Sequence, residues 1–214
     1  MKKPDISAGK FSSWHDDTLT TQLEFSGSDV PCGTCTACCT SSYFIHIKPE
    51  EVKTLARIPQ ELCFAAPGLP QGNVVMGYDQ EGHCPMLINN KCSIYEDRPQ
   101  TCRNYDCRIF PATGISLTEQ DKVLINQQAT RWRFTLEDQE DQNRQAAVKR
   151  AARFLQECNQ HFKAHELPRN ETQLAIVAIK VYELFLEDLT GVSDHEIARR
   201  IIRTHAEFEE RSKE

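Results

Sequence analysis

Long apolar runs and a surplus of positive charge are both missing from this sequence. Its longest uninterrupted apolar run is LAIVAI, residues 174–179, whereas a helix that crosses a bilayer needs about 20 apolar residues. Residues 1–17 lack the apolar core of a secretory signal peptide. The formal net charge of -6 argues against a broad nucleic-acid-binding surface, which is normally basic. The sequence therefore predicts a cytoplasmic protein that binds neither membranes nor nucleic acid.

Glycine-rich phosphate loops are missing as well. The nine glycines are scattered along the chain, and neither GxxxxGK[ST] nor GxGxxG occurs. With 39% hydrophobic residues in 214, the chain can nevertheless bury a core. These absences leave cysteine as the main functional signal.

Cysteine is abundant, with ten residues in the chain. Nine of them lie within residues 32–107, and Cys158 is the tenth. Thiols stay reduced in the cytosol, so this density indicates metal or redox chemistry more than a disulfide framework. Cys63 has apolar neighbours, and Cys158 lies on the apolar stripe of an expected helix. We interpret both as core thiols.

The remaining eight cysteines form two groups. The first has the pattern C-x2-C-x2-C-C, and the second combines C-x7-C with C-x4-C. Two residues between thiolates let both sulfurs of a turn reach one metal. The predicted metal ligands are Cys32, Cys35, Cys38, Cys39, Cys84, Cys92, Cys102 and Cys107.

The number of metal sites stays open at this point. Neighbouring side chains diverge from the backbone, so Cys38 and Cys39 do not easily bind one ion together. One hypothesis sends each of them to a different site. The competing hypothesis is one polynuclear cluster with spare thiols.

The identity of the metal stays open too. A 4Fe–4S iron–sulfur cluster and zinc both accept four thiolates. The C-x2-C-x2-C spacing is similar to a bacterial ferredoxin run, but here the fourth cysteine follows immediately. Thiolate ligation leaves negative charge on the sulfurs, and Arg98 and Arg103 flank Cys102. We predict these two arginines to act as donors around the ligands.

The predicted fold class is α+β. A polar N-terminal arm is expected over residues 1–31 and a small, irregular metal-binding module over 32–117. A helical region packed on that module is expected over 118–214, because apolar residues recur there at three- and four-residue spacing. Ser193 and Glu196 form a capping-box pattern that predicts the start of the last helix.

Two blocks, CGTCTACC and CPMLINNKCSIYEDRPQTCRNY, together resemble the CxxCxxCC family, a zinc- or iron-chelating domain. The resemblance implies bound metal and a mostly bacterial group of proteins. It also suggests a distant similarity to flagellin lysine N-methylases. Cys107 is outside this motif.

Two classes of function follow from these observations. The first is a metal-binding protein whose thiolate-held metal has a structural or electron-transfer role, with a protein partner bound through the helical half. The alternative is an enzyme, or enzyme subunit, related to protein-lysine N-methylases, whose catalytic residues the sequence does not reveal. Binding of S-adenosylmethionine would separate the two.

Overall fold

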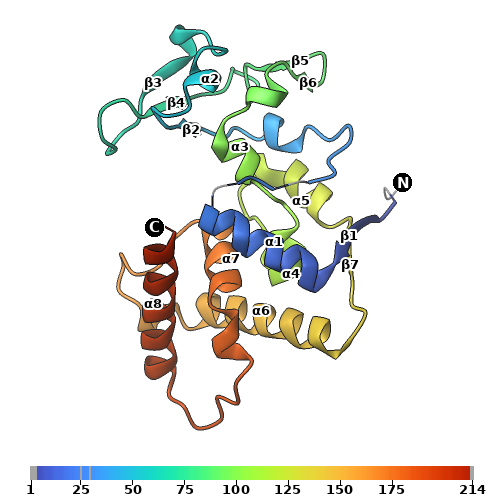
Figure 1. Cartoon of the computed structure of the whole chain (residues 1–214), viewed down its shortest axis with the longest axis vertical. Coiled ribbons are helices and arrows are strands. Elements are labelled where there is room, and N and C mark those ends of the chain that lie inside the picture. The colour runs from blue at the N-terminus through green and yellow to red at the C-terminus, as the bar shows by residue number, and fades with distance from the viewer. Residues whose placement is uncertain (1–3, 25, 29, 213–214) are drawn as a thin grey trace. The chain divides into compact units, whose positions relative to one another are not determined.

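The computed structural model describes residues 4–24, 26–28 and 30–212, apart from the side chain of residue 121 (Figure 1). Helices and three small sheets make up the chain, which confirms the predicted α+β class. Contacts divide the chain into two compact units. The helical unit comprises Met1–Glu24, Cys107–Leu117 and Ala129–Glu214, and the cysteine unit comprises Phe25–Asp106 and Thr118–Gln128.

This division differs from the boundary expected at residue 117. Residues 107–117 belong to the helical unit, and residues 118–128 belong to the cysteine unit. The sequence pattern showed where helical periodicity begins but not which segments contact each other. No described helix has both the length and the apolar character needed to cross a membrane.

The helical unit is built mainly from its longer helices. Its elements are β1 (Ile6–Lys10), α1 (Phe11–Glu24), α4 (Ile109–Thr113), β7 (Trp132–Thr135), α6 (Gln139–Glu157), η5 (Asn159–His161), α7 (Glu171–Lys180), η6 (Tyr182–Phe185) and α8 (Asp194–Arg211). Strand β1 pairs in parallel with β7, although more than 120 residues separate them (Figure 1). Helix α6 contacts α1, α4 and α7, so it lies at the centre of this unit's packing.

The prediction of a polar arm over residues 1–31 is wrong for residues 6–24. The side chain of Phe11 is fully buried, and those of Trp14 and His15 are at most 4% exposed. Buried Thr18 and Thr21 continue the same helix face, and the Thr18 hydroxyl donates to the Trp14 carbonyl at 2.8 Å. Because threonine occupies these core positions, the stripe looked polar in the sequence.

The predicted capping of the last helix is confirmed. The Ser193 hydroxyl accepts a hydrogen bond from the backbone N–H of Glu196 at the start of α8. The helical region before it is not one continuous helix. Helix α7 ends at Lys180 and the tighter turn η6 follows, which brings the Tyr182 ring to 4.4 Å from the ring of His15.

The cysteine unit is built from much shorter elements. They are η1 (Ala37–Thr40), β2 (Ile45–Ile47), α2 (Val52–Leu55), η2 (Gln60–Leu62), β3 (Cys63–Ala65), β4 (Val74–Met76), β5 (Leu87–Ile88), β6 (Lys91–Cys92), η3 (Tyr95–Asp97), α3 (Gln100–Asn104), η4 (Gln120–Lys122) and most of α5 (Val123–Ala129). Strands β2, β4 and β3 form an antiparallel sheet in that order. Its inner face contributes to a small apolar core of Ile47, Ile58, Met76, Met86 and Ile94.

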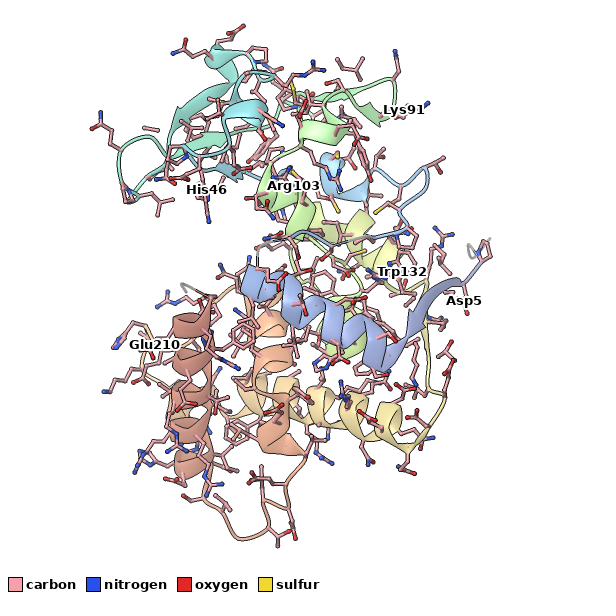
Figure 2. The ribbon with its side chains drawn as sticks, in the orientation of Figure 1. Asp5, His46, Lys91, Arg103, Trp132 and Glu210 are labelled. Carbon is pink, nitrogen blue, oxygen red and sulfur yellow. The ribbon has the colours of Figure 1, made fainter. Side chains whose placement is uncertain are left out.

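The β5–β6 hairpin has a two-residue turn at Asn89 and Asn90. Both asparagines have positive φ, 51° and 59°, as a type I′ turn requires. Asparagine tolerates this left-handed conformation better than other non-glycine residues. The turn places Lys91 opposite Ile88 and Cys92 opposite Leu87, and Figure 2 shows Lys91 at this hairpin.

Candidate metal centre

Two of the predicted ligands meet through the backbone. Cys39 lies on η1, and its carbonyl accepts a hydrogen bond of 2.7 Å from the N–H of Cys84. The N–H of Ser42 also donates to the Gly82 carbonyl at 3.0 Å. The end of the first cysteine block is therefore docked against the start of the second.

The hairpin brings Cys92 to the same place. Leu87 N–H donates to the Cys84 carbonyl at 2.9 Å, and Ser93 N–H donates to the Met86 carbonyl at 2.8 Å. These bonds close the loop between the two cysteines. Cys84 and Cys92 both pack against the apolar core of the cysteine unit.

Cys102 comes from α3. Pro99 precedes this helix, and the Pro99 carbonyl accepts the N–H of Cys102 at 2.9 Å. The Thr101 hydroxyl donates to the carbonyl of His46 on β2 at 2.7 Å. Helix α3 is thus fixed to the same sheet that supports the hairpin.

The four thiols of Cys39, Cys84, Cys92 and Cys102 interact electrostatically in all six pairs. Burial raises the pKa of Cys39 to about 12, and thiolates at Cys84 and Cys92 add to the rise. Burial also raises the pKa of Cys102 to about 12, again with contributions from the other three sulfurs. Burial raises the pKa of Cys84 as well. Without a cation, Cys39, Cys84 and Cys102 stay protonated at neutral pH, so metal binding would release protons.

The four-thiol group is chemically suited to a thiophilic metal. Thiolate sulfur selects zinc and iron–sulfur clusters over hard cations. Among the described His, Cys, Asp and Glu residues, however, three potential ligand atoms come within 4.8 Å of one another only in the group Asp79, Glu81 and His83, in which both carboxylates are exposed. No three of the described cysteine sulfurs therefore all lie within 4.8 Å of one another.

Three other predicted ligands lie in the first cysteine block. Cys32 is exposed, while Cys35 and Cys38 are partly buried. The charges of Cys32 and Cys35 both raise the pKa of Cys39, so their sulfurs lie within electrostatic range of it. The N–H of Cys35 donates to the Cys32 carbonyl at 3.0 Å, which closes the C-x2-C turn.

Cys107 belongs to the helical unit rather than to the cysteine unit. Its side chain is 6% exposed, and its sulfur accepts a hydrogen bond of 3.2 Å from the indole N–H of Trp132. Figure 2 labels Trp132 on β7. This contact gives Cys107 a packing role within its own unit.

The two predicted arginine donors differ in their partners. Arg98 lies over the Tyr95 ring, 4.0 Å from its centroid, and donates to the Tyr95 carbonyl at 2.8 Å. Its positive charge opposes the rise in the pKa of Cys102. Arg103 instead donates to the side-chain oxygen of Gln100 at 2.8 and 3.2 Å.

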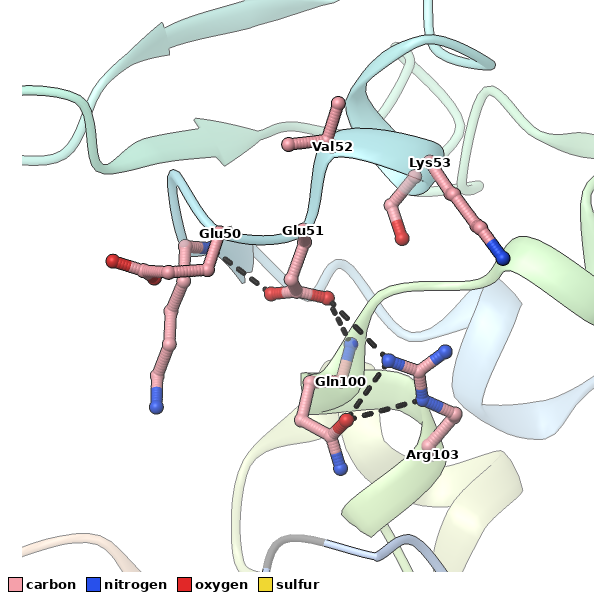
Figure 3. Close-up of a pocket in the computed structure, with 8 residues that line it drawn as sticks. Glu50, Glu51, Val52, Lys53, Gln100 and Arg103 are labelled. Carbon is pink, nitrogen blue, oxygen red and sulfur yellow. Dashed lines mark hydrogen bonds and ion pairs between the residues drawn. The ribbon is translucent and has the colours of Figure 1, made fainter.

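Glu51 is a residue that the sequence pattern did not single out. Its carboxylate accepts from the backbone N–H of Lys48 at 2.9 Å and of Gln100 at 2.5 Å, and lies 3.9 Å from Arg103. These groups line an open groove of about 520 Å³ beside α3 (Figure 3). Glu51 therefore connects α2 to the first turn of the helix that carries Cys102.

Cys63 and Cys158 were predicted to be core thiols. Cys63 lies on β3 opposite Met76 and packs against the apolar core of the cysteine unit. Cys158 follows α6 in the helical unit. Burial raises the pKa of both thiols, which keeps them protonated at neutral pH.

The geometry thus defines a class of protein, one with a cluster of partly buried thiols drawn from three chain segments. Residues 31–133 match the model of the CxxCxxCC family, described as a "putative zinc- or iron-chelating domain". This match confirms the family resemblance and extends it beyond Cys107, into the segment that carries η4 and α5. No curated protein and no solved structure matches the chain significantly.

Proposed function

We propose that this protein holds a 4Fe–4S cluster through Cys39, Cys84, Cys92 and Cys102. The observation that carries this proposal is the mutual electrostatic interaction of these four thiols, which come from η1, from residues 84–92 and from α3. The N–H of Cys84 also donates to the Cys39 carbonyl at 2.7 Å. Four thiolates are the usual ligand set of such a cluster.

The described sulfurs do not form the close group of three that a single zinc ion needs. Zinc–sulfur bonds of about 2.3 Å in a tetrahedron place sulfur atoms about 3.8 Å apart. Three sulfurs within 4.8 Å of one another do not occur among the ten cysteines, all of which are described. A 4Fe–4S cluster would be held by the same four thiolates without requiring three sulfurs within that distance, because it would bring its own iron and sulfide atoms.

Two roles fit this site. The bound metal would hold the cysteine unit together, and an iron–sulfur cluster could also transfer electrons. A bound cluster supplies one-electron redox chemistry. The chain holds the four thiolates, and two of the cysteines, Cys84 and Cys92, pack against the apolar core that contains Met86 and Ile94, both at most 7% exposed. Arg98 contributes positive charge near Cys102, which favours a lower net negative charge at the site.

The other cysteines are assigned as follows. Cys32, Cys35 and Cys38 would flank the cluster as additional thiols or bind a second metal, and metal stoichiometry decides between one site and two. Cys107 stays a predicted ligand, and a Cys107→Ser variant tests it. If Cys107 only packs against Trp132, this variant retains the full metal content.

The experiment is anaerobic purification followed by analysis for iron, zinc and acid-labile sulfide, together with a visible absorption spectrum. We expect brown protein with about four iron and four sulfide per chain. Cys84→Ser should lose most of the iron. Cys63→Ser is the matched control, because Cys63 packs against the same apolar core but is not among the four, and it should retain the iron.

Two results would replace this proposal. Colourless protein with one or two zinc per chain would make the site a structural zinc site. A saturable thermal shift with S-adenosylmethionine would instead favour the alternative of an enzyme related to protein-lysine N-methylases.

A further inference from the structure

Lys122 is unusual for its burial. It is 5% exposed as a residue. The side chain of Lys180 is similarly covered, at 8% exposure, but it forms a close ion pair of 2.6 Å with Glu209. Lys122 ends η4, in the segment Thr118–Gln128 that belongs to the cysteine unit. Lysine is almost never fully buried unless specific partners stabilise its charge.

The partners of Lys122 lie next to the first cysteine block. Its ammonium group donates to the carbonyl of Ser41 at 2.6 Å and lies 4.2 Å from the centre of the Tyr43 ring. The carboxylate of Glu119 lies 3.7 Å away, on a side chain that is 52% exposed. Ser41 is fully buried, so its carbonyl needs a hydrogen-bond donor from the protein.

Ser41 ends the turn that carries Cys38 and Cys39. The N–H of Cys39 donates to the Thr36 carbonyl at 2.9 Å, and the Ser41 hydroxyl donates to the Ala37 carbonyl at 2.6 Å. Cys84 binds this turn through the Cys39 carbonyl. Lys122 binds it two residues further along, so the turn is fixed by two segments distant in the sequence.

We propose that Lys122 is a positioning residue of the metal site, an inference that rests on the proposed function. It holds the turn so that the Cys39 sulfur faces Cys84, Cys92 and Cys102. Its positive charge, held at the Ser41 carbonyl two residues after Cys39, would also offset part of the negative charge of the thiolates. The family match over residues 31–133 includes Lys122, although the cysteine motif itself ends earlier.

The test compares Lys122→Met with Lys53→Met in the full-length, cluster-loaded protein. Lys53 is an exposed lysine on α2 of the same unit, so it controls for the loss of one positive charge. Iron release to a ferrous chelator and the reduction potential of the cluster are measured for both. We expect Lys122→Met to release iron at least about tenfold faster, the range typical for groups that orient metal ligands. We also expect a more negative potential, because a nearby cation is lost.

A second variant separates position from charge. Lys122→Gln keeps an N–H donor for the Ser41 carbonyl but removes the charge, so it should release iron more slowly than Lys122→Met and share its shift in potential. This variant also answers the question if Lys122→Met fails to fold.

The outcomes separate the proposed metal site from the proposed role of Lys122. If the wild-type chain takes up neither iron nor zinc, the proposed function fails and the role of Lys122 fails with it. If the wild-type chain holds the metal, and both Lys122 variants match Lys53→Met in release rate and potential, the metal site stands. Only the role of Lys122 is then overturned.

Discussion

The two units of this chain are stabilised in different ways. In the helical unit, α6 and α8 have 19 and 18 residues, and they bury apolar side chains along a whole face. In the cysteine unit, the helices that lie wholly inside it have three to five residues. Its strands have two or three residues. Isolated helices this short are not stable by themselves.

The apolar cores differ in the same direction. The helical unit buries large side chains such as Phe11, Trp132 and Leu155 at 0–1% exposure. The buried cluster of the cysteine unit has five residues, and Cys84 and Cys92 pack at its edge. We infer that the apolar core is enough to stabilise the helical unit, whereas the cysteine unit also needs a metal held by its thiolates.

Metal removal should give the largest difference in stability between the two units. Treating the reduced protein with a chelator is expected to unfold the cysteine unit, because structural metal sites contribute about 10 kcal/mol to folding. The helical unit should stay folded. Trp14 and Trp132 are the two tryptophans of the chain and both belong to it, so their fluorescence reports on this unit alone.

Limited proteolysis reports on the other unit in the same experiment. Cleavage within residues 84–107 should become rapid after metal removal. If this segment stays protected in metal-free protein, the cysteine unit does not depend on metal and the comparison fails. Untreated protein, digested in parallel, is the control.

The second prediction concerns the helical unit and pH. His15 is fully buried, and its ring nitrogens make no hydrogen bond among the described residues. Burial lowers its pKa to about 4, and the nearby Ile179 backbone only partly opposes this shift. The unfolded chain, with a pKa near 6.5, binds the proton more tightly. Stability should therefore fall as pH drops from 6.5 towards 4, by about 3 kcal/mol in total.

His15→Phe is the matched variant for this effect. Phenylalanine keeps a planar ring against Phe11, whose ring is 5.8 Å from that of His15, and it removes the titration. Urea unfolding followed by tryptophan fluorescence at pH 7 and pH 4.5 measures both proteins. Equal pH dependence in the variant and the wild type would show that His15 is not responsible.

The third prediction concerns a polar link in the cysteine unit. Glu51→Ala removes the acceptor for the N–H groups of Lys48 and Gln100, and the Glu51 side chain is only 9% exposed. Hydrogen bonds to a charged group contribute about 1.5–3 kcal/mol, so a loss of about 2 kcal/mol is expected in metal-loaded protein. Urea unfolding followed by circular dichroism measures it.

Glu50→Ala is the control, since Glu50 is an exposed neighbour. It should change the stability by less than about 0.5 kcal/mol. A similar loss in both variants would mean that the effect comes from net charge rather than from the link between α2 and α3.

The smallest expected effect is at the start of α8. Ser193→Ala removes the acceptor for the N–H of Glu196 and should cost the helical unit about 1 kcal/mol. Thermal unfolding followed by tryptophan fluorescence should show a midpoint about 4 °C lower. Ser193→Asp keeps an acceptor at the cap and should restore the midpoint, and an unchanged midpoint in Ser193→Ala would exclude a capping contribution.

Local features of the fold were predictable from the sequence. The turn at Asn89 and Asn90, the helix that carries Cys102 and the cap at Ser193 depend on neighbouring residues, so short patterns predict them. The N-terminal helix was missed because Thr18 and Thr21 occupy core positions that usually hold apolar residues. A search at helical spacing from Phe11 and Trp14 would have indicated it.

The candidate site was predictable only in part. The residue type and spacing of the cysteines indicated metal, because thiolates two residues apart can share one ion. The grouping of Cys39 with Cys84, Cys92 and Cys102 depends on hydrogen bonds between distant segments. The contributions of Glu51 and Lys122 depend on such bonds as well.

The sequence by itself determined the chemistry of this protein, a dense set of thiols in a motif typical of metal binding. The tertiary structure decided which thiols converge, because pairings such as Cys84 with Cys39 are formed by backbone groups that every residue has. It also decided that Cys107 packs against Trp132 and that the buried Lys122 donates a hydrogen bond to the Ser41 carbonyl. Burial and non-local contact set these outcomes, and neither is encoded in the spacing of residues along the chain.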